Sequence, residues 1–135
     1  MFRLVKILNA GTNVPELFRL PATAETAYHE GDALVLTSGA LTHATATSKP
    51  TYVAAADAAA GVDTVPVYAV TPDMIFEAPL SAAPTGLTVG SVVTLAVNSA
   101  SAAYGVTATT TSGVATVVDL CHATASGDIV RVNFR

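Results

Sequence analysis

The amino-acid sequence predicts an all-β protein, folded as a compact β-barrel or sandwich, and three observations lead to this prediction. Valine and threonine dominate the apolar runs, and these residues favour strands over helices. The runs are short, and clusters of turn-forming residues separate them at intervals of about 8 to 12 residues. The order of turn, run, turn and run that follows Gly31 returns after Gly90, which indicates an internal duplication.

The duplication also predicts the domain organisation. The segments expected to be equivalent are Gly31 and Gly90, 51–55 and 114–118, and 65–70 and 129–134. Each half is too small to bury both faces of its own sheet, so we expect the halves to pack together around one core. The sequence therefore predicts a single β domain over residues 31–135, with repeats at 31–80 and 90–135.

Within this domain, two features bear on the individual elements. Ala54–Ala60 has helix propensity, but this segment is closed by Gly61 and is too short for a stable helix, so a turn is expected there. Pro66 lacks an N–H donor, which predicts that its strand lies at a sheet edge or begins near this residue. The expected strands lie near 33–37, 41–46, 51–55, 65–70, 74–78, 91–97, 104–110, 114–120 and 129–134.

Residues 1–30 differ from the rest of the chain and are expected to form an extended N-terminal arm. Val14-Pro15 and Leu20-Pro21 favour extended backbone, because a residue before proline avoids the helical region. The arm either folds back over its own domain or docks on a neighbouring subunit, and we expect the β domain to fold without it. The candidate contact residues of the arm are Phe2, Leu4, Val14, Pro15, Leu17, Phe18 and Leu20.

Composition limits the partners that the protein can have. Hydrophobic residues make up 51% of the chain but charged residues only 12%, which leaves a weakly charged surface and favours one partly covered by partners. The net charge of −4 and the six Lys and Arg residues argue against direct binding of nucleic acid. No run approaches the roughly 20 apolar residues of a membrane-spanning helix. No secretory signal is visible either, so we expect synthesis in the cytoplasm and no membrane contact.

The sequence contains no pattern typical of a catalytic, metal or cofactor site. His29, His43 and His122 are far apart and fit no metal-ligand spacing, so each is expected at the surface or at its rim. Cys121 lies in an apolar run and is expected to be a small buried residue of a strand. The acidic residues expected to serve as turn formers are Asp32, Asp57, Asp63, Asp73, Asp119 and Asp128. We therefore expect no cofactor, no bound metal and no enzymatic activity.

Several segments together resemble the capsid decoration, or cement, proteins of tailed bacteriophages. They are Asn13-Val-Pro-Glu16, Leu20-Pro21, the run from Glu30 to Thr42, Lys49-Pro-Thr-Tyr52 and the C-terminal Gly-Asp-Ile-Val-Arg-Val-Asn-Phe-Arg. The resemblance covers most of the chain and consists of turn and strand patterns. It implies a structural protein on the outside of the virion capsid that clamps neighbouring major capsid subunits. It further implies a homo-oligomer, often a trimer, whose N-terminal arm corresponds here to residues 2–21.

A second function remains open at the level of sequence. A tail- or fibre-associated β-domain that binds a host glycan or protein would have the same strand and turn pattern. Such a module usually presents aromatic side chains as a platform. Tyr28, Tyr52, Tyr68 and Tyr104 are dispersed along the chain and tryptophan is absent, which favours the capsid role over this alternative.

Overall fold

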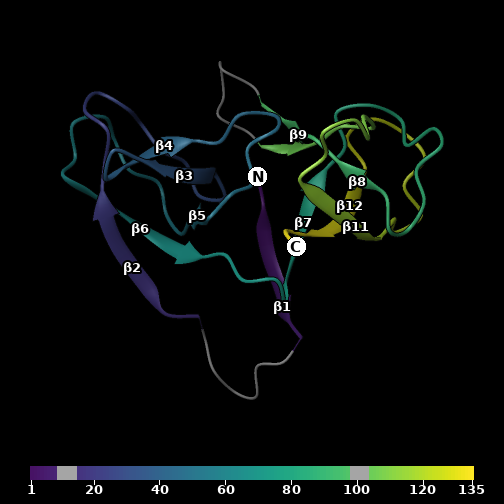
Figure 1. Ribbon diagram of the computed structural model, residues 1–135, viewed down its shortest axis with the longest axis horizontal. Helices are drawn as coiled ribbons and strands as arrows, with labels where there is room; N and C mark the ends of the chain where they lie inside the picture. Colours follow the sequence, from purple (N-terminus) through teal and green to yellow (C-terminus); the bar gives the residue numbers. More distant parts are fainter. Residues whose placement is uncertain (9–14, 98–103) are drawn as a thin grey trace.

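The computed structural model describes residues 1–8, 15–97 and 104–135 (Figure 1). Every regular element within these ranges is a β-strand, so the predicted all-β class is confirmed. The strands are β1 (Arg3–Ile7), β2 (Leu17–Pro21), β3 (Ala33–Thr37), β4 (Ala40–His43), β5 (Tyr52–Ala54), β6 (Thr64–Ala69), β7 (Met74–Pro79), β8 (Val92–Val93), β9 (Leu95–Ala96), β10 (Gly105–Val106), β11 (Ala115–Asp119) and β12 (Ile129–Asn133).

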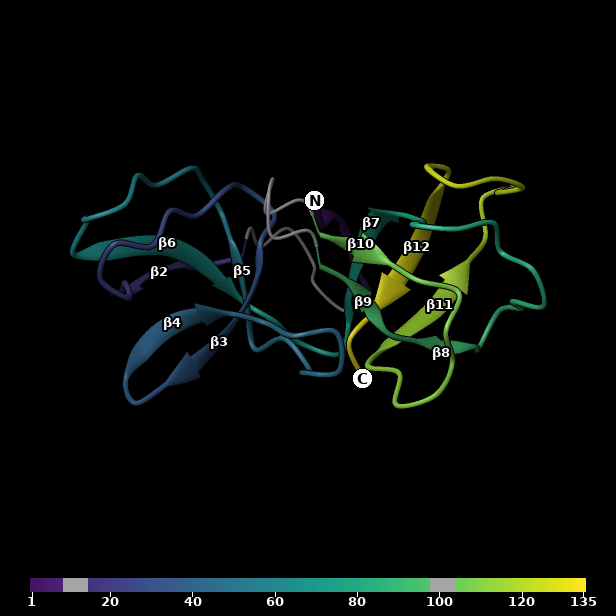
Figure 2. The ribbon, with the colours of Figure 1, turned by 90° about the horizontal axis from the view of Figure 1, so that it is seen from above.

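The strands form two five-stranded antiparallel sheets, which pack together as an all-β sandwich, and one short two-stranded pair. The first sheet has the order β2-β6-β5-β3-β4 and the second has the order β1-β7-β12-β11-β8, while β9 pairs with β10. Figure 2 shows the first sheet in one half of the molecule and the second sheet, with the short pair, in the other. Each sheet thus comes from one half of the chain, except that β1 joins the sheet of the second half.

The two halves repeat the same arrangement of strands, but with other bounds than the expected 31–80 and 90–135: the first repeat runs from β2 to β6 and the second from β7 to β12. Strands β2-β6-β5-β3 of the first sheet correspond in order to strands β7-β12-β11-β8 of the second. The residue after β2, Ala22, forms a parallel bridge to Leu41 of β4, and the residue after β7, Leu80, forms one to Val106 of β10. Both sheets therefore curl in the same way, and β4 is equivalent to β10.

Hydrogen bonds at the start of each repeat also coincide. The amides of Gly31 and Gly90 donate to the carbonyl oxygens of Ala54 and Val117, both at 2.8 Å. The amides of Ala54 and Val117 donate in return to the residue that follows each glycine. Gly31 and Gly90 have φ values of 83° and 92°, a conformation that glycine adopts without strain. The two turns are thus the same structure, made twice.

The last expected correspondence is displaced by one residue. Pro21 of β2 lies opposite Thr64, whereas Pro79 of β7 lies opposite Ile129. Thr64 is therefore the counterpart of Ile129, although the sequence pairs Ile129 with Val65. The reason is that the apolar run of the second repeat begins one residue earlier: the exposed position is Ile129 in the second repeat and Thr64, a polar residue, in the first.

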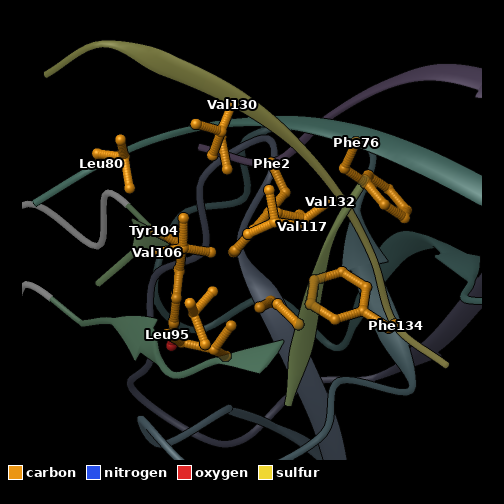
Figure 3. Packing of buried hydrophobic residues seen from close by; sticks show 14 of the residues in the cluster. Phe2, Phe76, Leu80, Leu95, Tyr104, Val106, Val117, Val130, Val132 and Phe134 are labelled. Carbon is orange, nitrogen blue, oxygen red and sulfur yellow. The ribbon is translucent and has the colours of Figure 1, made fainter. Parts of the chain in front are cut away.

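The main hydrophobic core lies in the second half and extends into the first. Figure 3 shows Phe2, Phe76, Tyr104 and Phe134 gathered with the valines of β11 and β12. Ala33, Ala44 and Val53 of the first half belong to the same buried cluster. A smaller cluster, confined to the first half, consists of Tyr28, Leu34, Leu41, Ala54, Val65 and Val67. The shared cluster explains why the two halves pack together.

The segment 1–30 is integrated into the fold rather than lying apart as an arm. Strand β1 pairs with β7 and strand β2 pairs with β6, each at the edge of its sheet. The β1 ladder is irregular between Leu4 and Lys6, which marks a bulge. The prolines of the segment are compatible with edge strands, because an edge strand pairs on one side only and needs no N–H donor on the other.

Two further expectations need correction. Strand β6, which contains Pro66, lies between β2 and β5 and not at an edge. The carbonyl oxygen of Pro66 accepts a hydrogen bond from the Ala55 amide at 2.9 Å, just beyond the end of β5, so the missing N–H costs the ladder little.

Cys121 is not in a strand: it follows β11 in a turn, with a φ of 50°, and is only half-buried.

We predict that Phe2→Ala lowers the free energy of unfolding by about 3 to 5 kcal/mol, because it leaves a cavity in the main core. Phe2 is only 2% exposed. Val5→Ala, three residues further along in β1, is the matched control, and it should change stability by no more than about 0.5 kcal/mol, since Val5 is 37% exposed. Urea unfolding followed by circular dichroism measures both. Equal stabilities of the two variants would contradict the integration of β1 into the core.

Candidate binding surface

The expected contact residues of the N-terminal segment fall into a buried group and an exposed group. Phe2 is in the core, and Leu4 packs against it in part. Leu20 packs against the smaller cluster of the first half. Leu17 and Phe18 are 53% and 42% exposed. Pro15 is half-buried, and Val14 lies outside the described residues.

Phe2 cannot serve as a contact for a partner, because aromatic rings surround it. Its ring meets those of Phe76 at 6.5 Å, Tyr104 at 6.4 Å and Phe134 at 5.3 Å. The register of β1 against β7 places the neighbouring Leu4 opposite Phe76. The alternation of Phe2 and Leu4 is the signal in the sequence that could have predicted a core-facing strand.

An ion-pair network on the outer face of the second sheet joins β1 to β7 and β12. It was not predicted from the sequence. The carboxylate of Glu77 in β7 accepts hydrogen bonds from the guanidinium groups of Arg3 in β1 and, at 3.3 Å, of Arg131 in β12. Arg131 also lies 3.8 Å from the carboxylate of Asp119. The guanidinium group of Arg3, and to a smaller extent that of Arg131, holds the pKa of Glu77 below its ordinary value.

The buried carboxylate of Asp32 belongs to a cluster of side chains through which the two halves are in contact. Asp32 is 1% exposed, and its Oδ2 accepts hydrogen bonds from the His29 amide at 2.8 Å and from His43 Nε2 at 3.0 Å. The ring of His43 stacks between those of Tyr28, at 5.2 Å, and Tyr104, at 6.0 Å. Asp32 therefore does form a turn, as expected, and His43 is half-buried, as a residue at the rim of the surface is.

The cluster of Asp32, His43, Tyr28 and Tyr104 contains residue types that transfer protons in enzymes, but neither tyrosine hydroxyl is free to act as a nucleophile. The hydroxyl of Tyr104 donates to the carbonyl oxygen of Ala44 at 3.0 Å, and burial together with the charge of Asp32 raises its pKa. The hydroxyl of Tyr28 likewise donates to the Leu41 carbonyl at 2.8 Å. Both hydroxyls are thus engaged in fixing backbone, and the cluster joins Tyr104 of the second half to the first.

Cys121 has no activating base beside it. Burial and the nearby Asp119 raise the pKa of the Cys121 thiol, which keeps it protonated near neutral pH. Its amide donates to the Asp119 side chain at 2.9 Å, a local turn interaction. Within residues 1–8, 15–97 and 104–135, no three His, Cys, Asp or Glu side chains lie together as a set that could hold a metal ion.

The cavities offer little to a small molecule. One of about 90 Å³ beside Phe2 and Gly31 is well below the roughly 300 Å³ at which ligand sites begin. A shallow depression of about 370 Å³ is lined by Arg3, Glu77, Pro79 and Ile129, together with Met1. Its two charged side chains already pair with each other, so few polar groups remain to orient a ligand.

Strand β2 combines two adjacent exposed apolar side chains with an open sheet edge. Leu17 and Phe18 are neighbours on this edge strand, and β6 pairs with only one side of it. In Figure 1, β2 lies at the margin of the molecule, away from the second half. An edge strand with exposed backbone groups and apolar side chains can add another strand, which makes this edge the candidate binding surface.

No protein-family model matches the chain, and no curated protein matches its sequence significantly. Among the described residues, no helix has the length and apolar character needed to cross a membrane.

We predict that the protein loses stability in acid as Glu77, Asp119 and Asp128 take up protons. The pKa of each carboxyl is lowered in the folded state, that of Asp128 by the amides of Thr124 and Ala125. Their stabilising contribution is complete above the ordinary values of 4.5 for Glu and 3.8 for Asp, and is lost as pH falls through the lower folded values.

Melting temperature measured from pH 7 to pH 2 tests this dependence. Glu77→Gln should be less stable than the wild type at pH 7, and the difference should shrink as the pH falls below 4.5. Glu16→Gln is the control, because this exposed carboxylate has no ion pair within the described residues. A difference between Glu77→Gln and wild type that is the same at both ends of the range would contradict the role assigned to the network.

Proposed function

We propose that the protein is a structural capsid decoration protein, which binds the outer surface of a phage head and stabilises contacts between major capsid subunits. The observation that carries the proposal is the exposed apolar edge of β2, with Leu17 at 53% and Phe18 at 42% exposure. This edge lies within residues 2–21, the segment to which the resemblance assigns the clamp. A homo-oligomer, a trimer by analogy with that family, is part of the proposal.

The composition of the surface supports this role. With 12% charged residues, the protein presents few side chains that would have to lose their hydration on binding. An interface built from apolar side chains and strand backbone is less sensitive to salt than one built from ion pairs. A protein bound to a lattice at many identical sites needs only a small gain in free energy at each site.

The alternative role in host binding receives less support. Tyr28 and Tyr104 are each 1% exposed, and Tyr52 and Tyr68 are half-buried. The tyrosines therefore provide no exposed aromatic platform for a glycan, and the chain has no tryptophan.

We predict that the protein protects expanded, DNA-filled heads against heat and that it binds unexpanded shells much less well. A ligand that binds one state alone stabilises it by about 2.7 kcal/mol per site at a hundredfold excess over its Kd. The experiment heats heads that lack the protein, with and without protein added back, across a salt series. DNA release and binding to both kinds of shell are measured.

The expected result is a higher temperature of DNA release with added protein, maintained at high salt. Release at the same temperature with and without the protein would overturn the proposed function, and so would equal binding to expanded and unexpanded shells. Heat-denatured protein added in the same amount is the control for nonspecific effects.

A further inference from the structure

The internal repeat provides a comparison between two equivalent strand edges. Strand β7 pairs with β12 on one side and with β1 on the other. Strand β2, its counterpart, pairs with β6 on one side, and within the described part of the chain no strand pairs with the other side. Glu16, Leu17, Phe18 and Arg19 therefore occupy the positions that in β7 face β1.

The burial of equivalent residues shows the effect of the missing strand. Phe18 corresponds to Phe76, because Pro21 corresponds to Pro79 at the end of each strand. Phe76 lies opposite Leu4 of β1 and is fully buried, whereas Phe18 is 42% exposed. A strand added beside β2 would cover Phe18 as β1 helps to cover Phe76.

Within the described ranges, the backbone of β2 has hydrogen-bonding groups on this side that no strand pairs with. The Pro66 carbonyl points to β5, since it accepts from the Ala55 amide. Arg19, opposite Pro66, is therefore a non-hydrogen-bonded partner of β6, and its own N–H and C=O point away from that strand. Leu17, two residues earlier, has the same orientation. The open edge thus presents two residues with their donors and acceptors available.

Charge defines the strand that would fit. At the equivalent position β7 has Glu77, which pairs with Arg3 of β1. In β2 this position is Arg19, so a fitting strand has an acidic residue there. A second copy's β1 would place Arg3 against Arg19, and like charges directly opposite each other destabilise a strand pair. A second copy's β2, paired antiparallel with this edge, would place Leu17 or Pro15 opposite Arg19, because only residues with the same backbone orientation can pair, and Glu16 has the other orientation. Neither strand of a second copy thus offers Arg19 an acidic partner, and charge complementarity favours a different chain.

We propose that the edge of β2 at residues 16–19 binds an extended segment of another protein as an added antiparallel strand, with an acidic residue opposite Arg19 and an apolar residue opposite Phe18. This inference rests on the proposed function in one respect, since it implies that the segment belongs to a subunit of the phage head. The binding itself can be tested without any particle.

The probes are two capped peptides based on β1, Glu-Leu-Val-Thr-Ile and Arg-Leu-Val-Thr-Ile, which differ only in the charge placed opposite Arg19. NMR titration of the labelled full-length protein measures their affinity and the amides that shift. The acidic peptide should bind about fivefold more tightly than the basic one. The amides of Leu17 and Arg19 should become protected from hydrogen exchange. In Arg19→Glu the preference should reverse.

Two controls separate strand addition from general apolar binding. Leu17→Pro removes an N–H that β6 does not use, so the protein should stay folded and lose the peptide, whereas Leu17→Ala should retain binding with lower affinity. Methylation of the acidic peptide at the amide of its Glu should abolish binding, and methylation at the adjacent Leu amide should not. This second test does not require any protein variant to fold.

Shifts away from β2, or a preference that Arg19→Glu leaves unchanged, would overturn the inference. Self-association that Leu17→Pro abolishes would also overturn it, in favour of a second copy as the occupant. The particle assay distinguishes the two proposals. If Leu17→Pro protein protects heads as well as wild type, the proposed function stands and the role of the edge falls. If the wild-type protein gives no protection, the proposed function is wrong, and the peptide titration still tests whether the β2 edge binds an added strand.

Discussion

The contact on which the rest of the structure depends is the insertion of Phe2 among Phe76, Tyr104 and Phe134. These four rings come from the start, middle and end of the chain, and few other large side chains are available in a core rich in valine and alanine. Aromatic pairs in edge-on arrangement contribute about 0.5 to 1.5 kcal/mol beyond the area they bury. Phe2 thereby ties the first strand to the last and makes the N-terminal segment part of the sandwich.

The two halves repeat one plan but differ in a polar contact at the start of the repeat. Each half has a first strand, a glycine turn and four further strands in equivalent places. The polar residue after the glycine has diverged: Ser91 bonds only its own turn, at 3.0 Å from the Thr88 amide, whereas Asp32 also binds His43. Through His43 and Tyr104, this one substitution between repeats connects the smaller half to the larger.

Much of this fold could be predicted from the sequence because local patterns determine it. The run from Ala33 to Thr37 coincides with β3, and the Gly31 and Gly90 turns are equivalent as expected. The integration of the first 30 residues could not be predicted so directly, because β1 pairs with a strand some 70 residues away and its bulge interrupts the alternation of side chains. The candidate surface was predicted in part: Leu17 and Phe18 are exposed, but the availability of the β2 edge depends on which strand β1 joins.

The bulge in β1 has a consequence for assembly. It disturbs the outer margin of the second sheet between Leu4 and Lys6, and the Arg3 and Lys6 side chains add positive charge there. Bulges and charged side chains are the devices by which natural sheets prevent edge-to-edge growth. The β2 ladder has a regular register. The edge at β1 is thus shielded and the edge at β2 is receptive. The β1 edge of one copy is therefore poorly suited to pair with the β2 edge of another, which works against open-ended, fibre-like association of identical copies.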